Sequence, residues 1–331
     1  MILAPTGNRD DLIIQAALNG LPNWEPLLLT GGLFDIGGPI SISDTPIIRG
    51  YGRTVTRLLM RANINDYCFK FTNGPTVGLQ MHDLYIDANG ANQSTEGGGV
   101  KMEGAIQCLI SNVHVEHPYN RGFYVHGDGN NGTGHHNRFI HCLVDNGGVS
   151  ASGFGRGLEF NSSDENYVGF CDFETNGRAA ATDPAHIYDA SGLQMIEQCV
   201  FVTGNQGIKI NSATGTIISG CQFDGVGNSN VQCNGGDVSI IGNHFFNIGT
   251  QSGAGTGVGC QIDNVQGVAI VGNTFATPGN GNAKAGVNLA NGADYCTVVG
   301  NTTNTNGGSW SSGAIVAGTG THNQIANNAS R

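Results

Sequence analysis

Titratable and aromatic side chains recur at two positions of a short repeated pattern, Gly–apolar–x–apolar–x. Copies such as GVKM (99–102), GFYV (122–125), GLEF (157–160) and GIKI (207–210) alternate like strands. The two apolar residues then face one way and the other two positions face the opposite way. The outward positions carry the following candidate side chains: Lys101, Tyr124, Glu159, Tyr188 and Lys209, with Glu103, His126, Asn161 and Asn211 two residues further on.

This mixture suits work on a polysaccharide. Tyrosine offers a flat apolar face to a sugar ring, and the charged and amide groups beside it bind hydroxyls. The charged and aromatic members lie between Lys101 and Lys209, and the later copies carry amides and small residues. We therefore expect a groove along these repeats in which substrate-binding groups surround a reactive centre.

Glycoside hydrolysis is the first chemistry that the residues suggest. It needs two carboxyl groups, about 5–5.5 Å apart for retention or about 6.5–9.5 Å for inversion. Strands stacked about 4.8 Å apart offer such separations between neighbouring repeats. We expect Glu159 to be one member and Asp189 or Asp183 the other. The register of HIYD (186–189) is ambiguous, and because burying a carboxylate is costly we expect Asp189 to face outward.

β-Elimination or epimerisation is the second chemistry. Each needs a base, an acid and a cation that neutralises a sugar carboxylate. Tyr124, His126 and Lys209 are candidates, with Arg121 or Arg156 at the start of their strands. A third possibility, from another class of protein, is a module that binds a glycan without cutting it.

A second repeat positions these residues. An apolar–x–apolar–x pattern ending in Asn, Cys or Asp returns about every 22 to 30 residues. Its end points are Asp83, Asn112, Cys142, Cys171, Cys199, Cys221, Asn243, Asn273, Asn301 and Asn328. A period of this size is typical of a solenoid, and alternation makes each copy a strand. We expect parallel strands stacked coil on coil, with asparagines bonding between turns and cysteines as buried thiols.

The first part of the chain has a different pattern. Asp10 and Asp11 precede an apolar helical stretch that Asn19, Gly20 and Pro22 should end, with an aspartate as the N-cap. Such a helix would cover the open end of a solenoid. We expect residues 1–75 to form a cap helix and the opening coils, and residues 76–331 one continuous run of β-helix repeats.

The order of IQAAL (14–18), LLLTGGLFDI (27–36) and IIRGYG (47–52), followed by the repeats, resembles the pectate-lyase-like proteins. This resemblance implies an all-β fold, a right-handed parallel β-helix with an N-terminal capping helix. Members include polysaccharide lyases, glycoside hydrolases, epimerases and phage tailspikes, and tailspikes are commonly homotrimers. The Asn-Thr-Asp, Asp-Asp and Gly-His-Gly motifs of the polygalacturonases are absent, which argues against that activity.

Composition narrows the partners. The net charge is −11 with only 14 Lys and Arg residues and no basic run, so nucleic acid and anionic membranes are not expected partners. We expect no cofactor and no metal, although calcium becomes possible if the substrate is a polyuronate; the few cations favour a neutral glycan. The start of the chain lacks a signal-peptide pattern and no apolar run is long enough for a membrane helix. We expect an extracellular or virion-associated carbohydrate-active enzyme, a hydrolase first and a lyase or epimerase second.

Overall fold

The computed structural model describes residues 1–43, 45–71, 76–127, 134–147, 154–176, 184–211, 214–250, 256–277, 282–290, 292–305 and 307–330. It contains two compact units. The N-terminal unit comprises Met1–Cys171 and Asn176–Pro184, and the C-terminal unit comprises Asp172–Thr175 and Ala185–Arg331. Each is built from parallel strands stacked one coil upon the next. Within the described residues, none of the helices has the length and apolar character needed to span a membrane.

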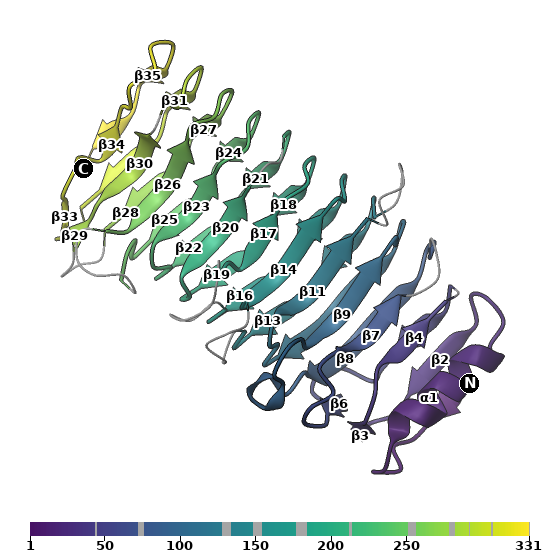
Figure 1. Ribbon diagram of the computed structural model, residues 1–331. Coiled ribbons are helices and arrows are strands. Elements are labelled where there is room, and N and C mark those ends of the chain that lie inside the picture. Colours follow the sequence, from purple (N-terminus) through teal and green to yellow (C-terminus); the bar gives the residue numbers. More distant parts are fainter. Residues whose placement is uncertain are drawn as a thin grey trace. The chain divides into compact units, whose positions relative to one another are not determined.

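Each unit has two main sheets, here called A and B. Sheet B of the N-terminal unit carries the predicted site residues on β9, β11 and β14. Its five parallel strands run side by side in Figure 1 in the order β4 (Ile40–Ile42), β7 (Tyr67–Phe71), β9 (Gly98–Glu103), β11 (Arg121–His126) and β14 (Arg156–Asn161). Burial alternates along β9 as expected, so that Val100 and Met102 are buried while Lys101 and Glu103 are half-buried. In β14 the outward Glu159 is buried as well. Parallel pairing places Lys101 beside Tyr124 and Tyr124 beside Glu159.

Sheet A of the same unit has two arms, because each coil contributes two consecutive strand segments. In β8 and β10 the segments run on as one strand, and β10 pairs with β12 by its first half and with β13 by its second. The strands are β1 (Ile2–Leu3), β2 (Pro26–Leu29), β3 (Gly32–Ile36), β5 (Ile47–Arg49), β6 (Thr56–Met60), β8 (Gln80–Asp87), β10 (Leu109–Glu116), β12 (Arg138–Ile140), β13 (Leu143–Asp145) and β15 (Tyr167–Gly169).

The bend between the two arms requires a left-handed residue in every coil. Asp83 and Asn112 occupy it with φ of 60° and 52°, and Gly220 and Gly242 do so in the C-terminal unit with φ of 62° and 63°. Asn, Asp and Gly tolerate these angles best. The inward ladder position of these coils is held by Leu84 and Val113, which pair with each other, and the register with the next coil puts Cys142 opposite Val113. Asp83 and Asn112 therefore lie one residue before the position where the sequence pattern placed them. The predicted register was wrong by one residue in these two coils.

The helix α1 (Asp10–Gly20) caps the N-terminal unit and packs against β3 and β4 (Figure 1). Its N-cap residue is Arg9, so the expected aspartate cap was wrong. The buried carboxylates of Asp10 and Asp11 instead accept hydrogen bonds from the backbone N–H groups of Asp35 and Gly37, at 2.8 and 2.9 Å. They join the cap to the first coils. The short 3₁₀ helix η1 (Gly90–Asn92) is the other helix of this unit's described residues.

The C-terminal unit repeats the same architecture. Its sheet B is β17 (Ile187–Asp189), β20 (Gln206–Ile210), β23 (Ser229–Cys233), β26 (Val258–Asp263), β30 (Ala285–Ala290) and β34 (Ile315–Val316). One arm of its sheet A is β18 (Met195–Glu197), β21 (Ile217–Ser219), β24 (Ser239–Ile241), β27 (Ala269–Val271), β31 (Thr297–Val299) and β35 (Gln324–Ala326). The other arm is β16 (Asp172–Glu174), β19 (Val200–Val202), β22 (Gln222–Asp224), β25 (His244–Phe246), β28 (Thr274–Ala276), β32 (Thr302–Asn304) and β36 (Ala329–Ser330). A small sheet pairs β29 (Asn282–Ala283) with β33 (Ser309–Trp310).

Two buried ladders hold the C-terminal coils in register. The side-chain carbonyl of Asn273 accepts from the backbone N–H of Asn243 at 2.8 Å, and Asn301 does the same for Asn273 at 2.9 Å. These bonds confirm the predicted asparagine ladder. A stack of phenylalanines follows it in the core, with centroid separations of 5.3, 4.6, 4.7 and 4.7 Å along Phe173, Phe201, Phe223, Phe245 and Phe275. All nine cysteines lie in the described part of the chain, buried, as thiols and not disulfides.

Candidate functional site

The outward face of sheet B in the N-terminal unit gathers most of the predicted side chains. Eight of them lie on β9, β11 and β14, which pair directly: Lys101, Glu103, Arg121, Tyr124, His126, Arg156, Glu159 and Asn161. We call this set the polar strip. Parallel strands keep equivalent residues about 4.8 Å apart, so the strip is a continuous surface of the width of a few sugar units.

Glu159 is the most enclosed member of the polar strip. Its side chain is only 3% exposed, and its carboxylate accepts hydrogen bonds from Arg121 and, at 2.6 Å, from Arg156. The ring of Phe154 lies 4.7 Å from both guanidinium carbons. Two cations therefore neutralise this carboxylate, and little of it is left for a substrate to reach. Its evident role is to hold the two arginines.

Tyr124 and His126 belong to the part of the strip that solvent can reach, together with Lys101, Glu103 and Asn161. Both are half-buried neighbours on β11, with ring centroids 5.6 Å apart. Arg121 lies over the Tyr124 ring at 4.3 Å and Lys101 at 5.9 Å, so the phenol sits among cations. Burial, and then the charge of Glu159, raise the pKa of Tyr124, which keeps the phenol protonated at neutral pH. Such a group is suited to donate a proton.

Two further observations bear on reactivity. The Nδ1 atom of His126 is buried with no hydrogen-bond partner among the described residues, a costly arrangement that a bound polar group would relieve. Lys101 is paired with Glu103 at 3.2 Å, but the two side chains are 25% and 45% exposed. Exposed ion pairs of this kind contribute little, so Lys101 can exchange Glu103 for an anionic ligand at small cost.

Four further predicted residues belong to the C-terminal unit: Tyr188, Asp189, Lys209 and Asn211. Tyr188 pairs with Lys209 across β17 and β20, and the lysine nitrogen lies 5.9 Å from the Tyr188 ring. Asn211 is exposed just after β20, and its N–H donates to the backbone carbonyl of Asp189 at 2.8 Å. These residues share the outward face of sheet B in this unit.

Asp189 is a correction to the expected orientation. It pairs with Ile210, takes the place of the second apolar residue of its repeat and is fully buried. The hydroxyl of Thr216 donates to it at 2.8 Å and the N–H of Ser191 at 3.0 Å, which offsets the cost that argued for an outward position. Burial raises the pKa of its carboxyl. Asp183, the alternative partner for Glu159, lies outside the described residues.

One cluster escaped the sequence reasoning. In the N-terminal unit, Asp87, Glu116 and Asp145 each end a strand of sheet A and pair in register on consecutive coils. His114, His117 and Tyr85 surround them. The signal was present in the sequence, because YID, HVE and LVD close three successive repeats with an acid. These acids lie on the other repeated strand and not on the Gly-initiated strands that predicted the polar strip.

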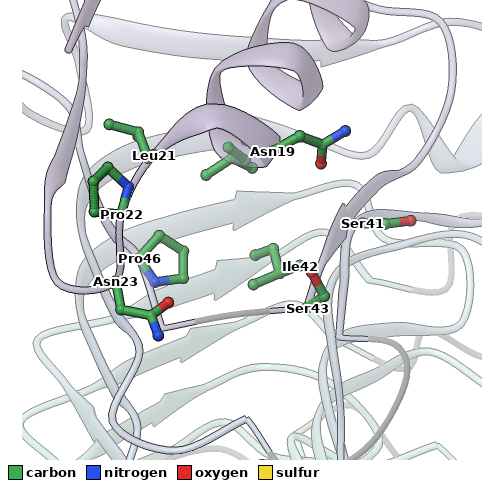
Figure 2. Close-up of a pocket in the computed structure, with 9 residues that line it drawn as sticks. Asn19, Leu21, Pro22, Asn23, Ser41, Ile42, Ser43 and Pro46 are labelled. Atoms are coloured by element: carbon green, nitrogen blue, oxygen red, sulfur yellow. The ribbon is translucent and has the colours of Figure 1, made fainter.

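A small hollow lies near the N-terminus, between the end of α1 and the first coils (Figure 2). Leu18, Leu21, Pro22, Ile42 and Pro46 supply apolar walls, and Asn19, Asn23, Ser41 and Ser43 supply amides and hydroxyls. None of these nine residues titrates near neutral pH, so the hollow offers no acid–base chemistry.

Comparison with known proteins identifies the fold. No protein-family model matches the sequence, and no curated protein matches it. Among solved structures, the chain is similar to the tailspike protein of E. coli bacteriophage HK620 in complex with a pentasaccharide, at 15% identity and a TM-score of 0.75 over 99% of this chain and 64% of that one. It is similar to the Azotobacter vinelandii mannuronan C-5 epimerase AlgE6 A-module, at 15% identity and a TM-score of 0.60 over 99% and 96% of the two chains.

A third similar structure is the endo-xylogalacturonan hydrolase from Aspergillus tubingensis, at 13% identity and a TM-score of 0.68 over 98% of this chain and 100% of that one. The fold is a right-handed parallel β-helix, as predicted. At these identities the likeness concerns the fold alone, and the three neighbours differ in activity. The choice of chemistry rests on the side chains of this protein.

Proposed function

We propose that this protein is a carbohydrate-active enzyme that binds an acidic polysaccharide along the polar strip and cleaves it by β-elimination. One observation carries the proposal: Tyr124 and His126 are adjacent and reachable among cations, whereas Glu159 is enclosed by arginines and Asp189 faces the core. The hydrolytic pair that the sequence favoured therefore lacks two accessible carboxylates. Of the second set, Tyr124, His126, Arg121 and Arg156 lie on the paired strands β11 and β14, whereas Lys209 belongs to the C-terminal unit.

The proposed chemistry assigns one role to each group. The imidazole of His126 takes the proton from the carbon next to the sugar carboxylate. The electron pair forms a carbon–carbon double bond and breaks the bond to the neighbouring glycosidic oxygen, which takes the proton of Tyr124. Lys101, released from its exposed pair with Glu103, neutralises the sugar carboxylate, which makes the carbon-bound proton easier to remove.

The placement of the pair favours elimination over epimerisation. Tyr124 and His126 both project from β11 to the same side of sheet B. Both then reach the same face of a sugar ring lying on the strip. Elimination of a proton and a leaving group from one face needs that arrangement, whereas epimerisation needs a donor on the opposite face. An acidic substrate revises the neutral glycan expected from composition, because the local cations and not the chain average meet the substrate.

A glycan partner has support from the neighbours, one of which is a tailspike in complex with a pentasaccharide. An extracellular or virion-associated setting agrees with the phage proteins among them. A homotrimer stays a prediction, and the mass of the protein in solution by light scattering tests it.

The function is tested with a panel of polyuronates and neutral glycans. Elimination creates an unsaturated sugar that absorbs in the ultraviolet, together with one new reducing end per cut. We expect both signals with a polyuronate and neither with neutral glycans. New reducing ends without ultraviolet absorbance would contradict the proposal in favour of a hydrolase, and binding without products would contradict it in favour of an adhesin.

A further inference from the structure

The carboxylate cluster of sheet A in the N-terminal unit has the composition of a metal site. Asp87 and Glu116 are the last residues of β8 and β10, which pair in register, and His117 follows Glu116 directly. One donor atom from each of the three lies within 4.8 Å of the other two. The imidazole lies between the acids, with Nδ1 at 3.3 Å from Asp87 Oδ1 and Nε2 at 3.7 Å from Glu116 Oε1.

The three donor atoms are close enough to share a small cation. In a tetrahedral site with bonds of about 2.1 Å, donor atoms lie roughly 3.4 Å apart, and here one atom from each residue lies within 4.8 Å of the others. The side chains of Asp87, Glu116 and His117 are 20%, 24% and 37% exposed, so an ion can reach them from solvent and keep water in its remaining positions.

The surroundings hold the donors in place. The N–H of Asn89 donates to Asp87 Oδ1 at 2.9 Å, and the hydroxyl of Tyr85 donates to Glu116 Oε2. The backbone of His117 is bonded on both sides, its N–H to the carbonyl of Asp145 at 3.2 Å and its carbonyl to the N–H of Gly90 at 2.7 Å. Outer hydrogen bonds of this kind orient metal ligands. The oxygens that face the imidazole are Oδ1 of Asp87, which also accepts from Asn89, and Oε1 of Glu116.

Electrostatics favours a cation at this point. Asp87, Glu116 and Asp145 occupy neighbouring positions on three consecutive strands, where like charges destabilise the sheet. His114 contacts Asp145 at 3.3 Å, and a single imidazole, that of His117, is shared by the other two carboxylates. A divalent ion would offset both charges at once.

We propose that Asp87, Glu116 and His117 bind a divalent first-row transition metal, of the class of Zn²⁺ or Mn²⁺. The imidazole nitrogen selects this class, because Ca²⁺ prefers six to eight oxygen ligands. The site is separate from the polar strip and does not depend on the proposed function. It revises the expectation that the protein holds no metal.

The test is calorimetric titration of the full chain, freed of metal by chelation, with Zn²⁺, Mn²⁺ and Ca²⁺ in turn. We expect one Zn²⁺ or Mn²⁺ per chain, with a rise in Tm on binding and weaker binding of Ca²⁺. H117A and, separately, E116Q should weaken binding at least 10-fold. E116Q keeps an acceptor for Tyr85, so it separates loss of a ligand from loss of folding.

The matched control is H322A. His322 of the C-terminal unit is exposed and bonded to one carboxylate, Asp294, at 2.8 Å, and no third candidate ligand joins this pair among the residues that the structure describes. H322A should bind metal like the parent protein. The proposal is overturned if neither Zn²⁺ nor Mn²⁺ binds, if Ca²⁺ binds more tightly than both, or if H117A and E116Q bind as well as H322A.

Discussion

The two units share a lysine–tyrosine contact on the outward face of sheet B, and each buries one carboxylate beside it. The side chains around that contact differ. Each has a lysine nitrogen 5.9 Å from a tyrosine ring on the paired strand, Lys101 with Tyr124 and Lys209 with Tyr188. In the N-terminal unit, an imidazole follows two residues after the tyrosine and arginines begin β11 and β14. In the C-terminal unit, Asp189 follows directly and turns into the core.

The buried carboxylates teach the same lesson. Glu159 is neutralised by two guanidinium groups, whereas hydroxyl and amide donors satisfy Asp189. Within the described residues no lysine or arginine forms an ion pair with Asp189. A repeated scaffold therefore fixes where side chains point, but the neighbours two residues along the strand and one strand across decide whether a position is reactive, structural or neither.

The first prediction breaks the comparison at its tyrosines. Y124F removes the proton donor and should lower the rate of polyuronate cleavage by at least about 100-fold, the usual contribution of a general acid. Y188F removes the equivalent hydroxyl of the C-terminal unit and should change the rate by less than about 2-fold. Initial rates of ultraviolet absorbance measure both. Equal losses in the two variants would show that Tyr124 has no special role.

The second prediction concerns the buried carboxylates. E159Q removes the buried carboxylate that Arg121 and Arg156 share and should lower the free energy of unfolding by about 3–5 kcal/mol. D189N replaces a carboxyl that forms no ion pair among the described residues by an amide. Its oxygen can accept from the N–H of Ser191 while its NH2 donates to the Thr216 hydroxyl, so the change should stay within about 1 kcal/mol. Urea unfolding of the two variants measures the difference. A larger loss for D189N would contradict this account of how each group is stabilised.

The third prediction concerns the pH dependence of stability in the C-terminal unit, where His186 is buried. Burial lowers the pKa of His186 from 6.5 to about 4. His186 of the unfolded chain therefore binds a proton near pH 6.5, whereas in the folded chain it stays unprotonated down to about pH 4. The free energy of unfolding should fall by up to roughly 3 kcal/mol as the pH drops through that window. Thermal melts of the parent and of H186Q measure it, and the variant should lose less stability on acidification.

Asp189 acts in the opposite direction on acidification. Because its folded pKa is raised, the folded state takes up a proton more readily than the unfolded state, and this contribution to stability is lost as the pH rises. D189N should therefore steepen the loss of stability in acid. An unchanged slope would mean that the carboxyl is not protonated differently in the two states.

The smallest effect is expected in the asparagine ladder. N273A removes the acceptor for the buried N–H of Asn243 and should cost about 1–3 kcal/mol. N112G, at the outer bend of the N-terminal unit, keeps a residue that tolerates the left-handed φ of 52°, removes a half-buried bond to Asp83 and should cost less than about 1 kcal/mol. Urea midpoints of the two variants compare an inward ladder with an outward one. Similar costs would argue that the inward position carries no extra penalty.

Much of this structure could be predicted from the sequence, because a period of stacked coils repeats the same inward apolar residues. The strands of sheet B, the cap helix and the asparagine ladder follow from such local patterns. The register at Asp83 and Asn112 was wrong because a left-handed residue before the ladder position looks like the ladder residue itself. A single sequence does not separate these two uses of a small polar side chain.

The site was less accessible to sequence reasoning. The outward residues of sheet B were assigned correctly where two apolar residues marked the inward face, as in β9 and β11. HIYD has no pair of apolar residues to show which face is inward. The donors of Thr216 and Ser191, which offset the cost of burying Asp189, could not be predicted from this segment. That Arg121 and Arg156 enclose Glu159 depends on side-chain directions across two strands, which spacing does not give.

The most direct test of the central claim is the mass of the fragments released from a polyuronate by the full chain. Elimination leaves each new non-reducing end one water lighter than hydrolysis does. We predict the lighter fragments for the parent protein and for Y188F, and their loss in Y124F. Fragments that carry the full added water would contradict the account and show that the reaction is a hydrolysis carried out by other groups.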